Sequence, residues 1–243
     1  MSSTTRRTSI ARVEQQDWAQ PIVKESLGDQ AYRTIRGSLM RGQLRPGAKL
    51  LLRPLSARFG ISATPMREAL MRLVSEKALT LDGRGTVVVP RLTLDQLLEI
   101  RAIRVDLEGR GAAAAAELAT EEEIDALAAV HDRIAECHQR EEFDAAVDLN
   151  TEFHLELCRL GRFPIVHEVV ESLWVRCGPI LSHLYDAGIP SDWDPHPHLR
   201  VIQALRERDP EAAREAIRED IERGGQGLLD HVRKADGSSP KVA

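Results

Sequence analysis

Residues 52–74 carry the pattern that most restricts the fold of this 243-residue chain. A short amphipathic run from Leu52 to Phe59 is followed by Gly60, which can adopt the positive φ of a sharp turn. Thr64 and Pro65 suit the start of a second helix, with Thr64 as its capping residue. That helix has one apolar face at helical spacing, formed by Met66, Ala69, Leu70, Leu73 and Val74. The pattern predicts a helix-turn-helix, whose second helix offers its N-terminal residues to a DNA major groove.

Two short β-prone runs follow the second helix. Residues 78–81 and 86–89 are separated by Asp82-Gly-Arg-Gly85, a turn-type sequence suited to a hairpin, and Pro90 ends the unit. A helix-turn-helix followed by a hairpin is the order of a winged helix. The sequence therefore predicts a small β-hairpin wing beside the DNA-binding helices.

The net charge of −5 hides a strong asymmetry between the two parts of the chain. Residues 1–90 carry 15 Lys and Arg against 7 Asp and Glu, a net charge of +8, whereas residues 91–243 carry 18 against 31, a net charge of −13. A basic block beside an acidic remainder is typical of a DNA-binding head on a body that does not bind DNA.

The first ninety residues resemble the GntR family of bacterial transcription regulators. The resemblance rests on Gly42-x-Leu44-x-Pro46-Gly47-x-x-Leu50, Leu55-Ser-x-Arg-Phe-Gly-Ile-Ser62, Thr64-Pro-x-Arg67-Glu-Ala-Leu70-x-Arg72-Leu73 and the wing glycine Gly85. We expect the DNA contacts to come from the start of the second helix, from the preceding helix and from the wing. The expected residues are Ser62, Thr64, Arg67, Arg53, Arg58, Arg84 and Gly85.

After Pro90 the strand signals disappear. Six helical segments follow, beginning near Leu94, Thr120, Glu142, Pro164, His198 and Asp209, with a turn-rich loop at residues 189–197. They predict an antiparallel helical bundle, so the fold class is mainly α. We expect flexible tails at residues 1–25 and 235–243, a winged helix-turn-helix at 26–90 and an all-helical domain at 91–234.

The body resembles the all-helical, ligand-sensing FCD domain of the FadR-like branch of the GntR family. The matching motifs are Arg104-x-x-x-Glu108, Asn150-x-x-Phe153-His154 and His198-x-x-x-Ile202-x-Ala204-Leu205, with Asp209, Ala212 and Ala213 beyond. The resemblance implies a homodimer that binds a small effector in this domain.

His154, His198 and Asp220 lie where the helical pattern predicts apolar core. A buried carboxylate without a partner is costly, so Asp220 should be paired or bound to a metal ion. Asn150 lies four residues before His154 and projects from the same helix face. Among the other histidines, we expect His131 and His138, which fall on a charged helix, to be exposed.

In metal-binding members of this branch, the resemblance implies an Asp four residues before a His, a later His and a third His in the last helix. Asn150 and Asp220 stand here in place of the Asp and the last His. Asn150, His154, His198 and Asp220 could together hold Zn²⁺, Ni²⁺ or Mn²⁺, although an amide oxygen is a weak ligand. Two alternatives are a metal-free effector pocket, lined by Arg104, Asn150, His154 and His198, and a structural hydrogen-bonded network. In the pocket, Arg104 would pair with a carboxylate ligand.

These observations predict a cytoplasmic transcription regulator, a repressor whose homodimer binds a pseudo-palindromic double-stranded operator and responds to a small carboxylate. The three cysteines show no paired spacing, and we find no signal peptide and no membrane-spanning run. A metal-sensing regulator is the main alternative. A metal-dependent enzyme is a weaker one, because no nucleophile–base pair is evident and an enzyme would leave the DNA-binding head unexplained.

Overall fold

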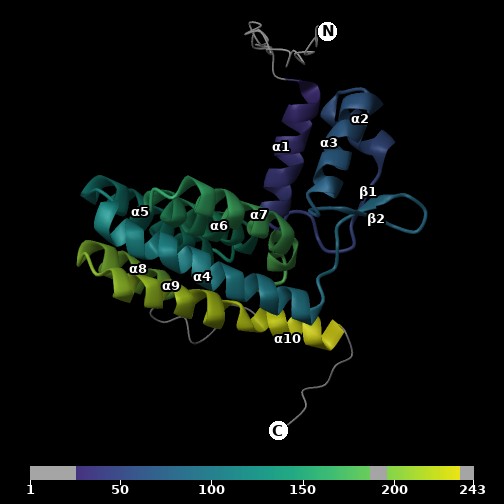
Figure 1. Ribbon diagram of the computed structural model, residues 1–243. Helices are drawn as coiled ribbons and strands as arrows, with labels where there is room; N and C mark the ends of the chain where they lie inside the picture. Colours follow the sequence, from purple (N-terminus) through teal and green to yellow (C-terminus); the bar gives the residue numbers. More distant parts are fainter. Residues whose placement is uncertain (1–25, 187–195, 236–243) are drawn as a thin grey trace, which may run out of the picture.

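The computed structural model describes residues 26–186 and 196–235 (Figure 1). It is mainly helical, with a small head that stands at one end of an elongated helical body. The tails predicted at 1–25 and 235–243 lie outside the described residues, except for Ala235, which ends the last helix. The described part of the loop at 189–197 is His196 and Pro197. No described helix is long and apolar enough to cross a membrane.

The head contains the predicted helix-turn-helix. Helix α1 (Leu27–Met40) packs on α3 (Ala63–Ser75), and α2 (Leu52–Phe59) is joined to α3 by a turn in which Gly60 has a φ of 65°. The prediction that Thr64 caps the second helix is wrong. Ser62 occupies the capping position and Thr64 lies in the first turn, so the helix begins about one residue earlier than the Thr-Pro pair suggests.

The predicted wing is confirmed as part of a three-stranded antiparallel sheet. Strand β3 (Val87–Val88) pairs with β2 (Thr80–Leu81) across the hairpin and with β1 (Lys49–Leu50) on its other side. The sequence did not predict β1, because a strand of two residues is too short to show alternation. The added strand attaches the wing to the segment between α1 and α2.

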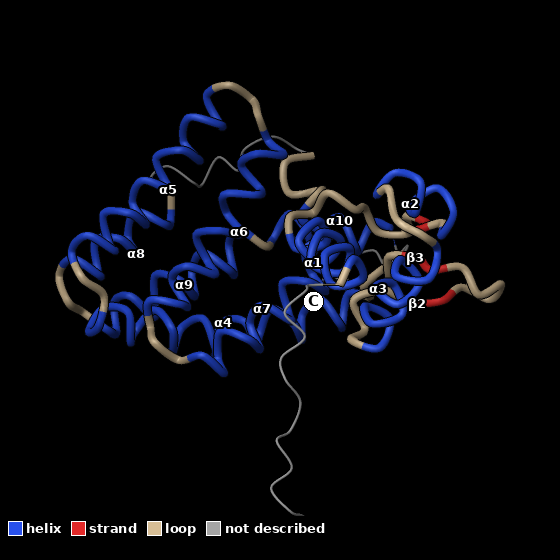
Figure 2. Tube along the Cα trace, turned by 90° about the horizontal axis from the view of Figure 1, so that it is seen from above, coloured by secondary structure: helices blue, strands red, loops and turns tan. Residues whose placement is uncertain are grey.

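The body is the predicted helical bundle, with seven helices within the described residues. They are α4 (Leu94–Leu118), α5 (Glu121–Gln139), α6 (Phe143–Leu160), α7 (Pro164–Leu181), α8 (Pro197–Arg206), α9 (Pro210–Gly224) and α10 (Gln226–Ala235). The long helix α4 packs against α6, α7, α8 and α9. Figure 2 shows the helical body from above, with the strands of the head at the other end of the molecule. The three cysteines, Cys137, Cys158 and Cys177, are free and buried.

One helix boundary in the body differs from the prediction. The segment expected to run unbroken from Asp209 to about Val232 is divided between α9 and α10. The break falls at Gly224 and Gly225, and each glycine costs a helix about 1 kcal/mol relative to alanine. The apolar stripe continues across the break in Leu228 and Leu229, which explains why periodicity alone indicated one helix.

The head is fixed to the body by the close approach of α1 and α7. A Cβ atom built on Gly178 of α7 would clash with the backbone of Leu39 and would lie 2.6 Å from the carbonyl oxygen of Met40. Only glycine allows this backbone-to-backbone contact. An ion pair of 3.3 Å between Arg36 and Glu171 lies beside it.

We expect Gly178→Ala to lower the free energy of unfolding by about 1–3 kcal/mol, because the added methyl group overpacks the contact between α1 and α7. Urea denaturation followed by circular dichroism measures the change. Gly227→Ala is the control, since nothing lies within 4 Å of a Cβ at this helical position. An equal loss of stability in both variants would contradict the assigned contact.

Candidate DNA-binding surface and buried histidine cluster

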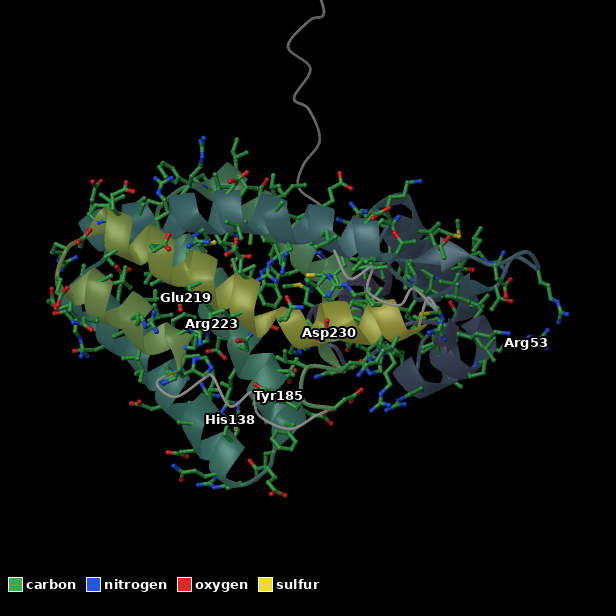
Figure 3. The ribbon with its side chains drawn as sticks, turned by 90° about the horizontal axis from the view of Figure 1, so that it is seen from below. Arg53, His138, Tyr185, Glu219, Arg223 and Asp230 are labelled. Atoms are coloured by element: carbon green, nitrogen blue, oxygen red, sulfur yellow. The ribbon has the colours of Figure 1, made fainter. Side chains whose placement is uncertain are left out.

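The structure places all the predicted DNA contacts on the surface of the head. Arg53 and Arg58 lie on α2, Arg67 lies near the start of α3, and Arg84 lies in the wing turn. All four are exposed, as are Ser62, Thr64 and Gly85. Figure 3 shows Arg53 on the part of the head that is remote from the body.

These four arginines differ from Arg72, which is also exposed in the head but is engaged by neighbouring side chains. Arg72, on the same helix as Arg67, lies 3.8 Å above the ring of Tyr32 and pairs with Asp29 and Glu76. No side-chain hydrogen bond or ion pair joins Arg53, Arg58, Arg67 or Arg84 to another residue of 26–186 or 196–235. Their positive charges are therefore available to phosphate oxygens and base edges.

The wing turn is held by Asp82. Its carboxylate accepts hydrogen bonds of 2.9 Å from the backbone N–H groups of Arg84 and Thr86, which lower its pKa. Gly85 has a φ of 75°, a conformation that disfavours side chains with a Cβ. A hollow of about 390 Å³ lies between the wing and α3, and Arg67 and Gly85 are among its lining residues. The wing and α3, the second helix of the helix-turn-helix, thus form one continuous surface.

The body contains a buried network of charges centred on Glu108 of α4. Its carboxylate accepts a hydrogen bond of 2.6 Å from Arg104 Nε, one of 3.1 Å from Trp174 Nε1 and one of 2.7 Å from His154 Nδ1. Burial raises the pKa of Glu108, but the charges of Arg104 and His154 outweigh burial and lower it to about 2. Glu108 is therefore ionised and joins α4, α6 and α7.

His154 lies between two carboxylates. Its Nε2 atom is 3.0 Å from Asp220 Oδ2, while Nδ1 faces Glu108. Burial lowers the pKa of His154, but the two carboxylates outweigh this effect and raise it, and the pKa of Asp220 is held at about 2. Because each of its ring nitrogens faces a carboxylate oxygen, the geometry favours the protonated, positively charged form of His154. Arg104 and His154 then balance Glu108 and Asp220, which satisfies the requirement that buried charges be paired.

The predicted residues His154, His198 and Asp220 do come together, from α6, α8 and α9. His198 is fully buried, stacks on Phe153 at a centroid distance of 3.7 Å and places Nε2 3.6 Å from Asp220 Oδ1. Neither ring nitrogen of His198 has a hydrogen-bond partner. Burial lowers its pKa far below the usual value, so His198 is neutral.

This inner set of His154, His198 and Asp220 has the donor atoms and spacing for a divalent transition-metal ion. Ligand atoms about 2.0–2.2 Å from a tetrahedral ion lie about 3.4 Å from one another. One donor atom from each of the three residues lies within 4.8 Å of the other two, and the shortest contacts of Asp220 are 3.0 Å from Oδ2 to His154 and 3.6 Å from Oδ1 to His198, so small side-chain rotations would be needed to reach this value. Glu108 would orient His154 through its other nitrogen, as carboxylates commonly do for metal-binding histidines. An ion would displace the proton from His154 Nε2.

Asn150 and Arg104 lie at the edge of this cluster. Both line a cavity of about 40 Å³ together with Asp220, but Asn150 makes no hydrogen bond to His154, His198 or Asp220. The cavity has room for a water molecule or an ion. Arg104 is already paired with Glu108, and its guanidinium lies 4.0 Å above the Trp174 ring.

Sequence analysis missed the outer part of the cluster. The prediction that His131 is exposed is wrong: its exposed fraction is 5%, because this face of α5 packs against α8. His138 is only partly exposed and lies 2.9 Å from the hydroxyl of Tyr185, which Figure 3 shows beside it. His196 is also buried and lies near His131. The many charged residues of α5 had suggested that His131 is exposed, although its side chain faces the interior.

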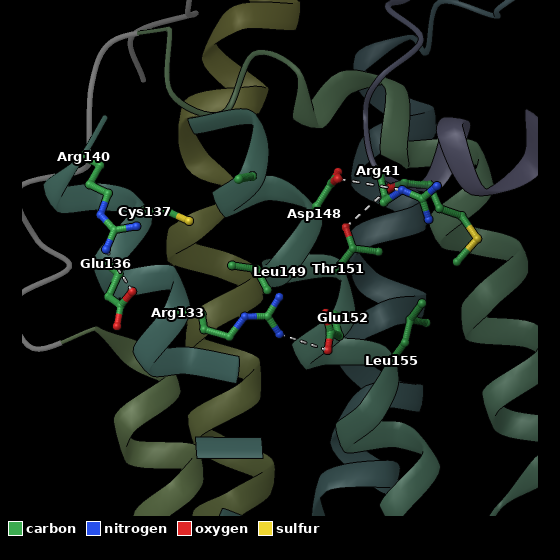
Figure 4. A pocket seen from close by; sticks show the side chains of 12 residues that line it. Arg41, Arg133, Glu136, Cys137, Arg140, Asp148, Leu149, Thr151, Glu152 and Leu155 are labelled. Carbon is green, nitrogen blue, oxygen red and sulfur yellow. Dashed lines mark hydrogen bonds and ion pairs between the residues drawn. The ribbon is translucent and has the colours of Figure 1, made fainter. Parts of the chain in front are cut away.

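A larger cleft of about 630 Å³ lies where the end of α1 meets α5 and α6 (Figure 4). Three arginines line it, but each already has an acidic neighbour within 4.0 Å. The pairs are Arg41–Asp148, Arg133–Glu152 and Arg140–Glu136. Because each arginine is already paired with a carboxylate, we expect the cleft to bind an anionic ligand less strongly than three unpaired arginines would.

Comparison with known proteins identifies the class to which this arrangement belongs. Residues 27–89 match the family described as bacterial regulatory proteins, gntR family, and residues 99–223 match the FCD domain. The chain therefore belongs to the GntR family of transcription regulators, in the FadR-like branch that carries an FCD domain.

Individual relatives agree with this classification. The chain is 34% identical over 197 residues to the HTH-type transcriptional regulator McbR of Escherichia coli, covering 80% of this chain and 89% of that protein. It is 23% identical to the E. coli transcriptional repressor RspR, covering 86% and 90%. The solved structure of E. coli McbR/YncC superposes with a TM-score of 0.80 at 31% identity, covering 86% and 99%. A GntR structure from Rhodococcus, at 20% identity and a TM-score of 0.71, shares the fold.

Because several buried histidines are neutral, we expect the free energy of unfolding to decrease as the pH is lowered. Burial lowers the pKa of His196 to about 4, so below the ordinary value of 6.5 the unfolded chain takes up a proton that the folded chain does not. We expect this group alone to reduce the free energy of unfolding by about 1 kcal/mol between pH 6 and pH 5.

His196→Asn should remove that contribution while keeping a residue that can cap α8. Urea denaturation at pH 5, 5.5 and 6, with a chelator present, measures the slope. The range stays above the pH at which Glu108 and Asp220 lose their charge. An unchanged slope in the variant would show that His196 is not buried in its neutral form.

Proposed function

We propose that this regulator is a repressor whose homodimer binds a pseudo-palindromic operator and releases it when a small ligand binds in the body. The observation that carries the proposal is the set of exposed, unpaired arginines on α2, α3 and the wing, which supply the contacts of a winged helix. Their charge is concentrated in the head, while the body is acidic. We place the regulator in the cytoplasm, because its operator DNA is there.

Arg67 is the residue that we assign to base recognition. It lies on the exposed side of α3 near its N-terminus, opposite the buried Met66, Leu70 and Leu73. That end of the recognition helix is the part that meets base edges in a helix-turn-helix. Arg53, Arg58, Ser62 and Thr64 are also exposed, and we assign them to the DNA backbone and the groove edge.

We expect Arg67→Ala to weaken binding to a preferred duplex by about tenfold to a hundredfold, since one bidentate base contact contributes about 1–3 kcal/mol. The duplex is selected from a random pool with the full chain, and affinity is measured by fluorescence anisotropy. Arg206→Ala is the matched control, because it removes an exposed arginine from α8 in the body instead. Equal affinities of the Arg67 variant and the wild-type chain for the selected duplex would overturn the assignment.

The wing residue Arg84 should act on the DNA backbone. We expect Arg84→Ala to reduce the slope of log affinity against log salt by about 0.9, the effect of losing one phosphate contact. Gly83→Ala alters the same turn without removing charge, and nothing lies within 4 Å of its Cβ. If the salt slope of the Arg84 variant stays at the wild-type value, Arg84 does not contact phosphate.

The proposed homodimer is supported by an apolar surface on the body. Phe163, Ile165 and Val169, at the start of α7, and Leu118, at the end of α4, are between 43% and 74% exposed. Neighbouring exposed apolar side chains of this size indicate a protein contact. A second copy of the chain is the occupant that a two-headed operator complex requires, because two heads match two half-sites.

We place the effector site at the buried cluster, with Arg104, Asn150, His154 and His198 as its contacts. The small cavity beside Asp220 has room for an ion as it stands. A carboxylate ligand would have to compete with Glu108 for Arg104. A divalent ion bound through His198, with Asn150 and Asp220 at the edge of the cavity, would add positive charge that favours a carboxylate ligand. The relatives McbR and RspR are named as a transcriptional regulator and a transcriptional repressor, which favours this function over a metal-dependent enzyme.

The coupling from this site to the head runs through α7. Trp174 donates a hydrogen bond to Glu108 in the cluster, and Gly178, one helical turn later, contacts the backbone of Leu39 and Met40 in α1. α1 in turn packs on the recognition helix α3. A shift of α7 caused by a ligand would therefore move the head. Operator binding by a dimer depends on the separation of its two heads, so a small shift is enough.

A further inference from the structure

Three imidazoles form a second, outer set beside the inner one. His131 comes from α5, His196 from the residue before α8, and His198 from the first turn of α8. One ring nitrogen from each lies within 4.8 Å of those of the other two. Segments that are 65 residues apart in the sequence numbering, at 131 and 196, therefore bring three nitrogen donors to one point.

The spacing of these rings agrees with that of imidazoles on a shared ion. The centroids lie 5.0 Å apart for His131 and His196, 4.4 Å for His196 and His198, and 5.6 Å for His131 and His198. Three imidazoles bound to one tetrahedral ion at about 2.0–2.1 Å have centroids about 5 Å apart. Small side-chain rotations would complete the geometry.

The outer set also contains buried nitrogen atoms without partners. His198 has none at either ring nitrogen, and Nδ1 of His131 has none either. Their residues are 0% and 5% exposed, so bulk water does not satisfy these atoms. Buried polar atoms of folded proteins normally have hydrogen-bond partners, and exceptions call for an explanation such as an ion.

We propose that His131, His196 and His198 bind a divalent transition-metal ion of the Zn²⁺, Ni²⁺ or Co²⁺ type, in a site distinct from the inner set of His154, His198 and Asp220. The three donors are imidazoles, which suit such ions, and the fourth position is open to a water molecule. The proposal does not depend on the proposed function, since it concerns metal binding alone.

His198 belongs to both sets, and this makes the two sites alternatives. A neutral imidazole has one lone pair for coordination, because its other ring nitrogen carries the proton. His198 can therefore serve one ion at a time, and the chain binds one ion rather than two. The outer site requires no displacement of the His154 proton, whereas the inner site does.

Binding at the outer site would also change the start of α8. Nδ1 of His196 accepts a hydrogen bond of 3.2 Å from the backbone N–H of His198, which caps this helix. A neutral His196 cannot both accept that bond and coordinate an ion, so coordination replaces the cap. The outer site thus couples metal binding to the N-terminus of α8.

The test measures zinc affinity of the full-length, untagged chain after chelator treatment, by competition with a chromogenic chelator. We expect one Zn²⁺ per chain, and a loss of affinity of at least tenfold in both His131→Leu and His196→Asn. Asp220→Asn, which alters only the inner set, should keep affinity within threefold. Circular dichroism spectra and thermal melting curves of the metal-free variants identify any variant that is unfolded. If either His131→Leu or His196→Asn is unfolded, the other still tests the outer site.

Cobalt absorption provides a second readout. Co²⁺ bound by wild-type chain and by Asp220→Asn should give the same visible bands, and His131→Leu should lose them. No zinc binding by the wild-type chain, two ions per chain, or loss of affinity in Asp220→Asn would each overturn the proposal. Loss in Asp220→Asn alone would place the ion in the inner set, and loss in all three variants would indicate a single joint site.

Discussion

The buried carboxylate of Glu108 is the constraint on which the body of this regulator depends. It is fully buried and ionised, and its partners come from three helices: Arg104 on α4 itself, His154 on α6 and Trp174 on α7. Removal of one partner from a buried ion pair costs about 3–5 kcal/mol. The network therefore sets which faces of these helices meet, and it brings His154 to Asp220 on α9.

Much of the fold could be predicted from the sequence because its signals are local. Gly60 marks the turn between α2 and α3, and the capping box of Thr120 and Glu123 marks the start of α5. Strand β1 gave no such signal, because it has two residues and depends on pairing with the distant strand β3. The break after α9 did have a local signal in Gly224 and Gly225, but the apolar stripe that continues into α10 indicated one unbroken helix.

Part of the candidate site could also be predicted from local sequence signals. His154, His198 and Asp220 were recognisable as polar groups on apolar helix faces, and the structure brings them together. Glu108 lies four residues after Arg104, which predicts a helical ion pair but not its complete burial. His131 lies on a helix rich in charge, so its inward orientation becomes visible only once α8 packs against α5. Burial of a single polar residue is a tertiary property.

The contact between the body and the head has a mechanical consequence. Most helices touch through side chains, whose rotamers can absorb a small displacement, but Gly178 brings the backbone of α7 directly against that of α1. A displacement of α7 at this point would therefore have to move α1 as well. Trp174 lies one turn before Gly178 on the same helix and is hydrogen-bonded to Glu108. Three contacts thus connect Glu108 with the recognition helix α3: the hydrogen bond from Trp174, the backbone contact at Gly178 and the packing of α1 on α3.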